Sequence, residues 1–166
     1  GGAAVPLHAL IETHGALADV RTMAAHPRIQ SLSFGLMDFV SAHRGAIPAS
    51  AMGAKGQFEH PLVVRAKLEI AAACHAHAKV PSHCVVTEFK DKRALQDAAT
   101  MACRQFGYTR MWSIHPDQIR TIVDAFTPSV AEVDQAVEII TAAHAVQWAP
   151  IRHHDTLHDR ASYRYF

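Results

Sequence analysis

The stretch LHALIETHGALADVRTMAAHPRIQSLSFG, residues 7–35, decides the fold that the sequence predicts. It begins with an apolar run at 7–11, which predicts a strand, and continues with apolar residues at helical spacing over 16–25. Pro27 ends this helical pattern, and a second apolar run at 31–34 predicts another strand. A strand, a helix and a strand in this order predict a β-α-β unit with two parallel strands.

The same alternation continues along the rest of the chain. A long glycine-containing loop is expected over 44–60, and a capping box at Ser129–Glu132 opens a last helix that runs to about 148. The remaining expected elements are helices at 61–78, 92–106 and 117–126 and short strands at 84–86 and 111–114. Four β-α units predict an α/β protein with a parallel sheet, which is either half of an eight-stranded barrel or an open four-stranded sheet.

The composition of the 166 residues excludes several classes of protein. The chain is 49% hydrophobic and carries 16 basic against 15 acidic residues, so it is too apolar to be disordered and too neutral to grip nucleic-acid phosphates. Its apolar runs are shorter than the roughly 18 residues of a membrane span. Three cysteines without a CxxC pair favour a reducing cytoplasm. We therefore expect a cytoplasmic protein that binds small molecules and neither nucleic acid nor membrane.

Polar residues follow the predicted strands, where parallel α/β proteins bind their ligands. Glu12 follows the first strand and Asp38 the second. Neighbouring strands lie about 5 Å apart, so the two carboxylates could share one ion, and oxygen ligands favour Mg²⁺ or Mn²⁺ over Zn²⁺. Carboxylates there also cap helices, and His115 before Pro116 is equally typical of a cap neighbour, so spacing alone leaves the site open.

The histidines near the end of the chain are interpreted differently. Residues 152–166 are polar and contain His153, His154 and His158. A solvated tail is favoured over a metal site there. Lys55 in the long loop is likewise interpreted as a solvated lysine rather than a ligand of a phosphate group.

Four motifs in this order resemble the citrate lyase beta subunit and malyl-CoA lyase family. They read IET at 11–13, SFGLMDF at 33–39, WSIHPDQI at 112–119 and FTPS at 126–129. Each motif is weak alone, and their common order makes the resemblance specific. The chain departs from the family pattern at Leu36, at residues 80–83 and at Thr109–Arg110, where the family often has a proline, an aspartate-containing strand and Gly-Lys.

The resemblance implies a TIM (β/α)₈ barrel, of which this chain would be the C-terminal half, strands 5–8, followed by an extra helix. Residues 1–149 would form that half-barrel with the helix, and 150–166 a tail that serves as a lid segment. A half-barrel leaves two strand edges exposed, which favours pairing with further chain. Relatives also imply a homo-oligomer, a trimer or hexamer, in which the lid supplies an acid, here Asp155 or Asp159.

The implied activity is that of a Mg²⁺-dependent carbon–carbon lyase. It would cleave a 3-hydroxyacyl-CoA thioester, such as citryl-, malyl- or citramalyl-CoA, into an acyl-CoA and a 2-keto acid. Glu12 and Asp38 would be the catalytic metal ligands for Mg²⁺, with Mn²⁺ as a substitute. The substrate contacts would be Gly35, Leu36, Met37, His115 and Pro116. The alternatives are a metal-dependent 2-keto-3-deoxy acid (pyruvate) aldolase without CoA and a non-catalytic barrel homologue.

Overall fold

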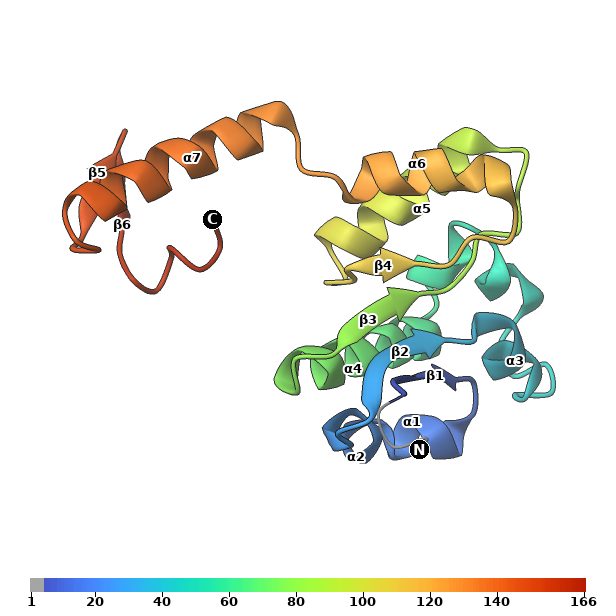
Figure 1. The fold of residues 1–166 in the computed structure, drawn as a ribbon. Helices are drawn as coiled ribbons and strands as arrows, with labels where there is room; N and C mark the ends of the chain where they lie inside the picture. Colours follow the sequence, from blue (N-terminus) through green and yellow to red (C-terminus); the bar gives the residue numbers. More distant parts are fainter. Residues whose placement is uncertain (1–4) are drawn as a thin grey trace. The chain divides into compact units, whose positions relative to one another are not determined.

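The computed structural model describes residues 5–166, which form two compact units that meet in sequence at Phe126 and Thr127 (Figure 1). The first unit contains the parallel sheet and most of the buried apolar side chains. The second unit has a small core of its own, built on Ile139, Ala143 and Tyr163. Each unit therefore holds its own hydrophobic cluster.

The first unit is a four-stranded parallel sheet in the order β1-β2-β3-β4 with helices after its strands. The strands are β1 (Leu7–Ile11), β2 (Ile29–Phe34), β3 (Val80–His83) and β4 (Arg110–Met111). The helices are α1 (His14–Ala18), α2 (Val20–Ala25), α3 (Leu36–Ser41), α4 (Pro61–Ala76), α5 (Lys92–Arg104) and α6 (Pro116–Phe126). The expected α/β class with a parallel sheet is confirmed, and the barrel half stays a prediction.

The two faces of this sheet differ because side chains alternate along each strand. Leu32 and Phe34 of β2 lie in the buried core with α2 and α4. Ser31 and Ser33 alternate with them along the strand, and Ser33 pairs in register with Leu10, which is 37% exposed. We call the side that carries Ser31 and Ser33 the open face of the sheet.

The third strand is the clearest difference from the expectation. We expected it at 84–86, and the structure places it at Val80–His83, so that prediction is wrong. Pro81 argued against a strand, because proline lacks an N–H for the ladder. Its carbonyl still accepts a hydrogen bond from the Thr109 N–H at 3.3 Å, and the strand is short enough to do without one donor.

Two helices also begin or end where the sequence did not indicate it. The helix expected over 16–25 is interrupted at Asp19, which ends α1 and precedes α2. Helix α3 begins directly after Gly35, in the segment between the second expected strand and the expected loop, where the sequence analysis assigned no element. The capping box at Ser129–Glu132 is confirmed, with the Ser129 N–H donating to Glu132 Oε2 at 2.7 Å.

The second unit consists of α7 (Val130–Ala145) and a hairpin of β5 (Ile151–His153) and β6 (Thr156–His158). The polar segment expected as a tail is therefore folded. The Tyr163 hydroxyl donates to the carbonyls of Ala149 and His158, at 2.8 and 3.1 Å, and its ring packs in the core of the unit. Among the described helices, none is long and apolar enough to cross a membrane.

Candidate functional site

The carboxyl ends of β1 and β2 bring Glu12 against the backbone of Gly35. Ile11 and Phe34 are register partners, and the Gly35 N–H donates to the Ile11 carbonyl at 2.8 Å. A Cβ atom at Gly35 would lie 2.6 Å from Glu12 Cβ and 2.7 Å from Glu12 Oε2, closer than real Cβ contacts. Glycine is required here because the Glu12 side chain occupies that space. The Glu12 carboxylate therefore lies at the start of α3.

Asp38 lies in the first turn of the same helix. Its side chain is exposed, while its backbone carbonyl accepts a hydrogen bond from Ser41 Oγ at 3.0 Å. Within residues 5–166, neither the Glu12 nor the Asp38 carboxylate has a hydrogen bond or ion pair. Two carboxylates without a bonding partner among the described residues are thus associated with one end of α3, a donor set suited to a hard cation.

The other residues of this motif contribute backbone rather than side chains. Leu36 is buried in the hydrophobic core, and Met37 is half-buried against it. The first hydrogen bond of α3 runs from the Phe39 N–H to the Gly35 carbonyl. The N–H groups of Leu36 and Met37, in the turn before it, therefore have no acceptor within the helix. These N–H groups are available donors for an anionic group beside the two carboxylates.

The residues at the start of α6 are arranged around Gln118, which sequence analysis did not single out as a positioning residue. Gln118 is buried, accepts from the Ile114 N–H at 2.9 Å and donates to the Val86 carbonyl at 2.9 Å. It thereby ties together the segments after β3 and β4. His115 is exposed, and its Nδ1 accepts from the Asp117 N–H at 3.2 Å, as a helix-cap neighbour does.

Pro116 is the first residue of α6, where its missing N–H is harmless. Within the described part of the chain, no hydrogen bond or ion pair joins His115 to Glu12 or Asp38. The structure therefore brings Glu12 and Gly35 into contact and places Asp38 on the adjoining helix, without a direct contact to the motif at α6.

The open face carries polar groups that sequence reasoning missed. The Arg110 guanidinium donates to Ser31 Oγ at 2.6 Å and to Ser82 Oγ at 3.3 Å. The Trp112 indole N–H donates to Ser33 Oγ at 3.0 Å, and the indole stays 45% exposed. The only signal was the alternation within SLSF at 31–34, and the strand register needed to pair these residues was not readable from the sequence.

A second polar cluster lies on the helix-covered side of the sheet and was also missed. The fully buried Lys67 ammonium of α4 donates to Gln57 Oε1 at 2.8 Å and contacts His83 Nε2 and Cys84 Sγ. Burial lowers the pKa of Lys67. Burial and the neighbouring Lys67 hold the pKa of His83 well below 6.5. We call Gln57, Lys67, His83 and Cys84 the buried cluster.

The acids expected in the lid segment are engaged locally. The Asp155 carboxylate pairs with Arg152 at 2.5 Å, and Asp159 Oδ1 accepts from the Ala161 N–H at 2.9 Å. Both aspartates lie in the second unit.

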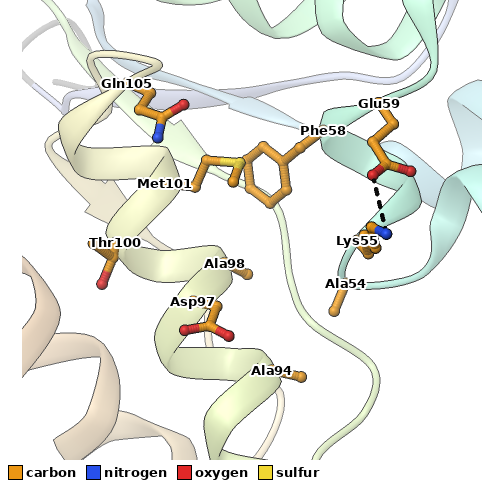
Figure 2. A pocket seen from close by; sticks show the side chains of 10 residues that line it. All are labelled: Ala54, Lys55, Phe58, Glu59, Ala94, Asp97, Ala98, Thr100, Met101 and Gln105. Carbon is orange, nitrogen blue, oxygen red and sulfur yellow. Dashed lines mark ion pairs between the residues drawn. The ribbon is translucent and has the colours of Figure 1, made fainter.

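A groove between α5 and the long loop holds none of the expected catalytic residues (Figure 2). Its volume is about 570 Å³, and Phe58 and Met101 face each other across it. Lys55 at its rim is 88% exposed and lies 3.5 Å from the Glu59 carboxylate, as a solvated loop lysine does.

Comparisons with known proteins agree with the family resemblance that the motifs indicate. No family model matches the chain. It is 28% identical over 151 residues to L-malyl-CoA/beta-methylmalyl-CoA lyase of Rhodobacter capsulatus, covering 83% of this chain and 46% of that protein. A crystal structure of a citrate lyase from Burkholderia xenovorans LB400 is 61% identical, with a TM-score of 0.89, over 99% of this chain and 52% of that one.

A structure of the protein CitE from Mycobacterium tuberculosis, in complex with magnesium, acetoacetate and coenzyme A, shares the fold. Its TM-score is 0.79 at 21% identity, over 98% of this chain and 59% of that one. The chain spans about half the length of the curated relatives it matches. The ordered motifs and these similarities support the assignment of the chain to the citrate lyase beta subunit and malyl-CoA lyase family.

Proposed function

We propose that the protein containing this chain is a Mg²⁺-dependent carbon–carbon lyase that cleaves a 3-hydroxyacyl-CoA thioester into an acyl-CoA and a 2-keto acid. The observation that carries the proposal is the Glu12 carboxylate, which lies against Gly35 at the start of α3 and has no partner within residues 5–166. The names of the relatives, malyl-CoA lyase and citrate lyase, support the reaction class.

The residues at this end of α3 fit a hard divalent ion. Glu12 and Asp38 supply carboxylate oxygens, and the absent side chain at Gly35 leaves the space that the Glu12 carboxylate needs. Mg²⁺ is commonly held by one or two carboxylates and keeps several waters, which a substrate can replace; Mn²⁺ accepts the same ligands. When bound, the ion would supply Lewis-acid stabilisation of negative charge on the substrate oxygen.

The chain's own groups then orient the substrate. The backbone N–H groups of Leu36 and Met37 would donate to the carboxylate of the keto acid beside the two acidic side chains. His115 and Pro116 would border the substrate at the start of α6, on the segment that Gln118 holds in place. Arg110 on the open face keeps guanidinium N–H groups beyond the two that donate to Ser31 and Ser82.

The wider architecture of the proposal follows the family. The four parallel strands would be one half of a (β/α)₈ barrel over residues 1–149, with the open face lining its interior. The 150–166 segment would act as a lid that offers Asp155 or Asp159. The protein would form a homo-oligomer, and the free thiols of Cys74, Cys84 and Cys103 agree with a cytoplasmic location.

The test measures release of acyl-CoA and keto acid from malyl-, citryl- and citramalyl-CoA by the protein that contains this chain, with and without Mg²⁺. Glu12→Gln and Asp38→Asn should each lower turnover by about 10³-fold, because the transition state loses a group that binds the ion. Glu59→Gln is the matched control, since Glu59 is an exposed carboxylate paired with Lys55.

Three outcomes would contradict the proposal. The first is unchanged Mg²⁺ affinity in both Glu12→Gln and Asp38→Asn. The second is turnover restricted to a CoA-free hydroxy-keto acid, which selects a pyruvate aldolase. The third is neither turnover nor metal binding, which selects a non-catalytic homologue.

A further inference from the structure

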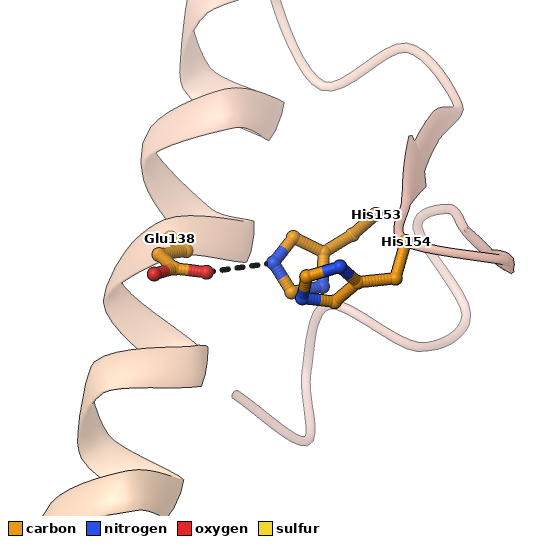
Figure 3. A group of neighbouring side chains, drawn as sticks. All are labelled: Glu138, His153 and His154. Atoms are coloured by element: carbon orange, nitrogen blue, oxygen red, sulfur yellow. Dashed lines mark hydrogen bonds and ion pairs between the residues drawn. The ribbon is translucent and has the colours of Figure 1, made fainter.

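A group of metal-ligating side chains lies in the second unit and has no part in the proposed lyase reaction. Figure 3 shows Glu138 on α7 facing His153 and His154, which come from the end of β5. One ligand atom from each side chain lies within 4.8 Å of the ligand atoms of the other two. Two imidazoles and a carboxylate therefore converge on one point of the molecule.

The backbone explains why two adjacent histidines face the same way. Neighbouring residues in an extended strand point to opposite sides. His154 follows the last residue of β5 and has a φ of 51°. The chain therefore turns there through the left-handed backbone conformation, which residues other than glycine seldom adopt. The ring centroids of His153 and His154 consequently lie 4.2 Å apart.

The distances suit a small ion after a minor adjustment. His153 Nε2 and Glu138 Oε2 are 2.8 Å apart. Two ligands of a tetrahedral Zn²⁺, each at about 2.0–2.1 Å, stand roughly 3.3 Å apart, so the pair has to open by about half an ångström. The Glu138 side chain is 63% exposed and free to make that movement, whereas His153 is only 14% exposed and is held in place.

We propose that Glu138, His153 and His154 bind a Zn²⁺ ion that crosslinks α7 to the β5–β6 hairpin. Imidazole nitrogen with one carboxylate oxygen is a donor set for borderline ions such as Zn²⁺, Co²⁺ and Ni²⁺, and a poor one for Mg²⁺. Three protein ligands leave a fourth position for water. The site replaces the ion pair between His153 and Glu138 with a metal bridge between the same two elements.

The experiment is a calorimetric titration of Zn²⁺ into the protein that contains this chain, in excess Mg²⁺ so that hard-cation sites are filled. The variants are Glu138→Gln and His154→Asn, which change exposed side chains and spare the half-buried His153. Asp134→Asn and His144→Asn are the matched controls, because both residues are exposed on the same helix. Co²⁺ serves as a second probe through its visible absorption.

We expect one saturable Zn²⁺ site in the wild type, weakened at least about tenfold in each ligand variant and unchanged in both controls. The Co²⁺ spectrum should lose intensity in the ligand variants alone. Equal Zn²⁺ affinity in the wild type and in the ligand variants overturns the proposal and leaves only the contact between His153 and Glu138. The absence of a saturable Zn²⁺ site in the wild type overturns it as well. Glu12→Gln should keep the Zn²⁺ site, so failure of the lyase proposal is distinguishable from failure of this one.

Discussion

The first unit contains two polar clusters that use their groups in opposite ways. In the buried cluster, the Lys67 ammonium contacts Gln57, His83 and Cys84, all buried. At the carboxyl ends of β1 and β2, the Glu12 carboxylate lies against Gly35 without a partner from residues 5–166. Polar groups removed from water have to bond to one another, whereas groups at an open edge stay available for a ligand. Enclosure therefore distinguishes the buried cluster, whose groups bond to one another, from Glu12, whose carboxylate is left without a partner among the described residues.

Aromatic rings complete the enclosure of the buried cluster. The Lys67 ammonium lies 4.6 Å from the ring centroid of Phe58, and the His83 ring stacks on Phe58 at 5.3 Å. The Tyr108 hydroxyl donates to the Lys67 carbonyl at 3.0 Å. Within the described residues, the Gln57 Nε2 group is the one buried amine or amide nitrogen of this cluster without a partner. Loss of a further hydrogen bond in the buried cluster should therefore lower the stability of the fold.

The largest effect on stability should follow Lys67→Met. The change keeps the apolar stem and removes the donor, so the buried His83 Nε2 loses its partner and Gln57 Oε1 keeps only the Cys84 thiol as a donor. Each such group costs about 1–3 kcal/mol, and we expect a loss of about 3 kcal/mol in the free energy of unfolding, measured with urea. Lys55→Met, at an 88% exposed lysine, is the control and should change little. A loss below about 1 kcal/mol would show that the buried cluster is not structural.

Gly35→Ala should act on the open edge rather than on the core. Its Cβ would meet Glu12 Cβ at 2.6 Å and Oε2 at 2.7 Å, so the carboxylate has to move. We expect Mg²⁺ affinity to fall about tenfold or more, equivalent to about 1.4 kcal/mol, in equilibrium dialysis. Gly45→Ala is unsuitable as a control because its φ is +88°, whereas Gly15→Ala meets nothing closer than Thr13 Oγ1 at 4.0 Å. Wild-type affinity in Gly35→Ala would mean that the position of Glu12 is unimportant.

Acid should destabilise the protein through His83. Its pKa is well below 6.5 in the folded state, because of burial and the neighbouring Lys67. The unfolded chain therefore binds a proton that the folded chain does not, and stability present above pH 6.5 is lost as the pH falls toward the lowered folded-state value. Between about pH 7.5 and 5.5 we expect a loss of about 1 kcal/mol from this group. His83→Asn should reduce that dependence, and an undiminished dependence would assign it to other histidines.

The smallest expected effect is that of Glu12→Gln on stability. The carboxylate has no hydrogen bond or ion pair in the described part of the chain, so its removal should change the free energy of unfolding by less than about 0.5 kcal/mol. Thermal unfolding at matched Mg²⁺-free conditions measures this directly. If Glu12→Gln lowered the free energy of unfolding as much as Lys67→Met does, the Glu12 carboxylate would be as important for stability as the buried cluster.

Local patterns in the sequence predicted much of the fold. The strand at Leu7–Ile11 and the capping box at Ser129 were predicted correctly, because periodicity and capping depend on residues a few positions apart. The order of the four motifs likewise indicated the family without any structure. The strand at residues 80–83 was missed because Pro81 is locally unfavourable, and only its neighbours in the sheet make it acceptable.

The sequence by itself determined the β-α alternation, the family and the two acidic side chains that follow β1 and β2. Only the tertiary structure decided that Lys67 is buried against His83, that Glu12 lies on Gly35 and that His153 and His154 converge on Glu138. These contacts join residues between 15 and 23 positions apart, through strand register, helix packing and a left-handed turn. Such contacts depend on how whole elements meet in space, which no local pattern of residue types encodes.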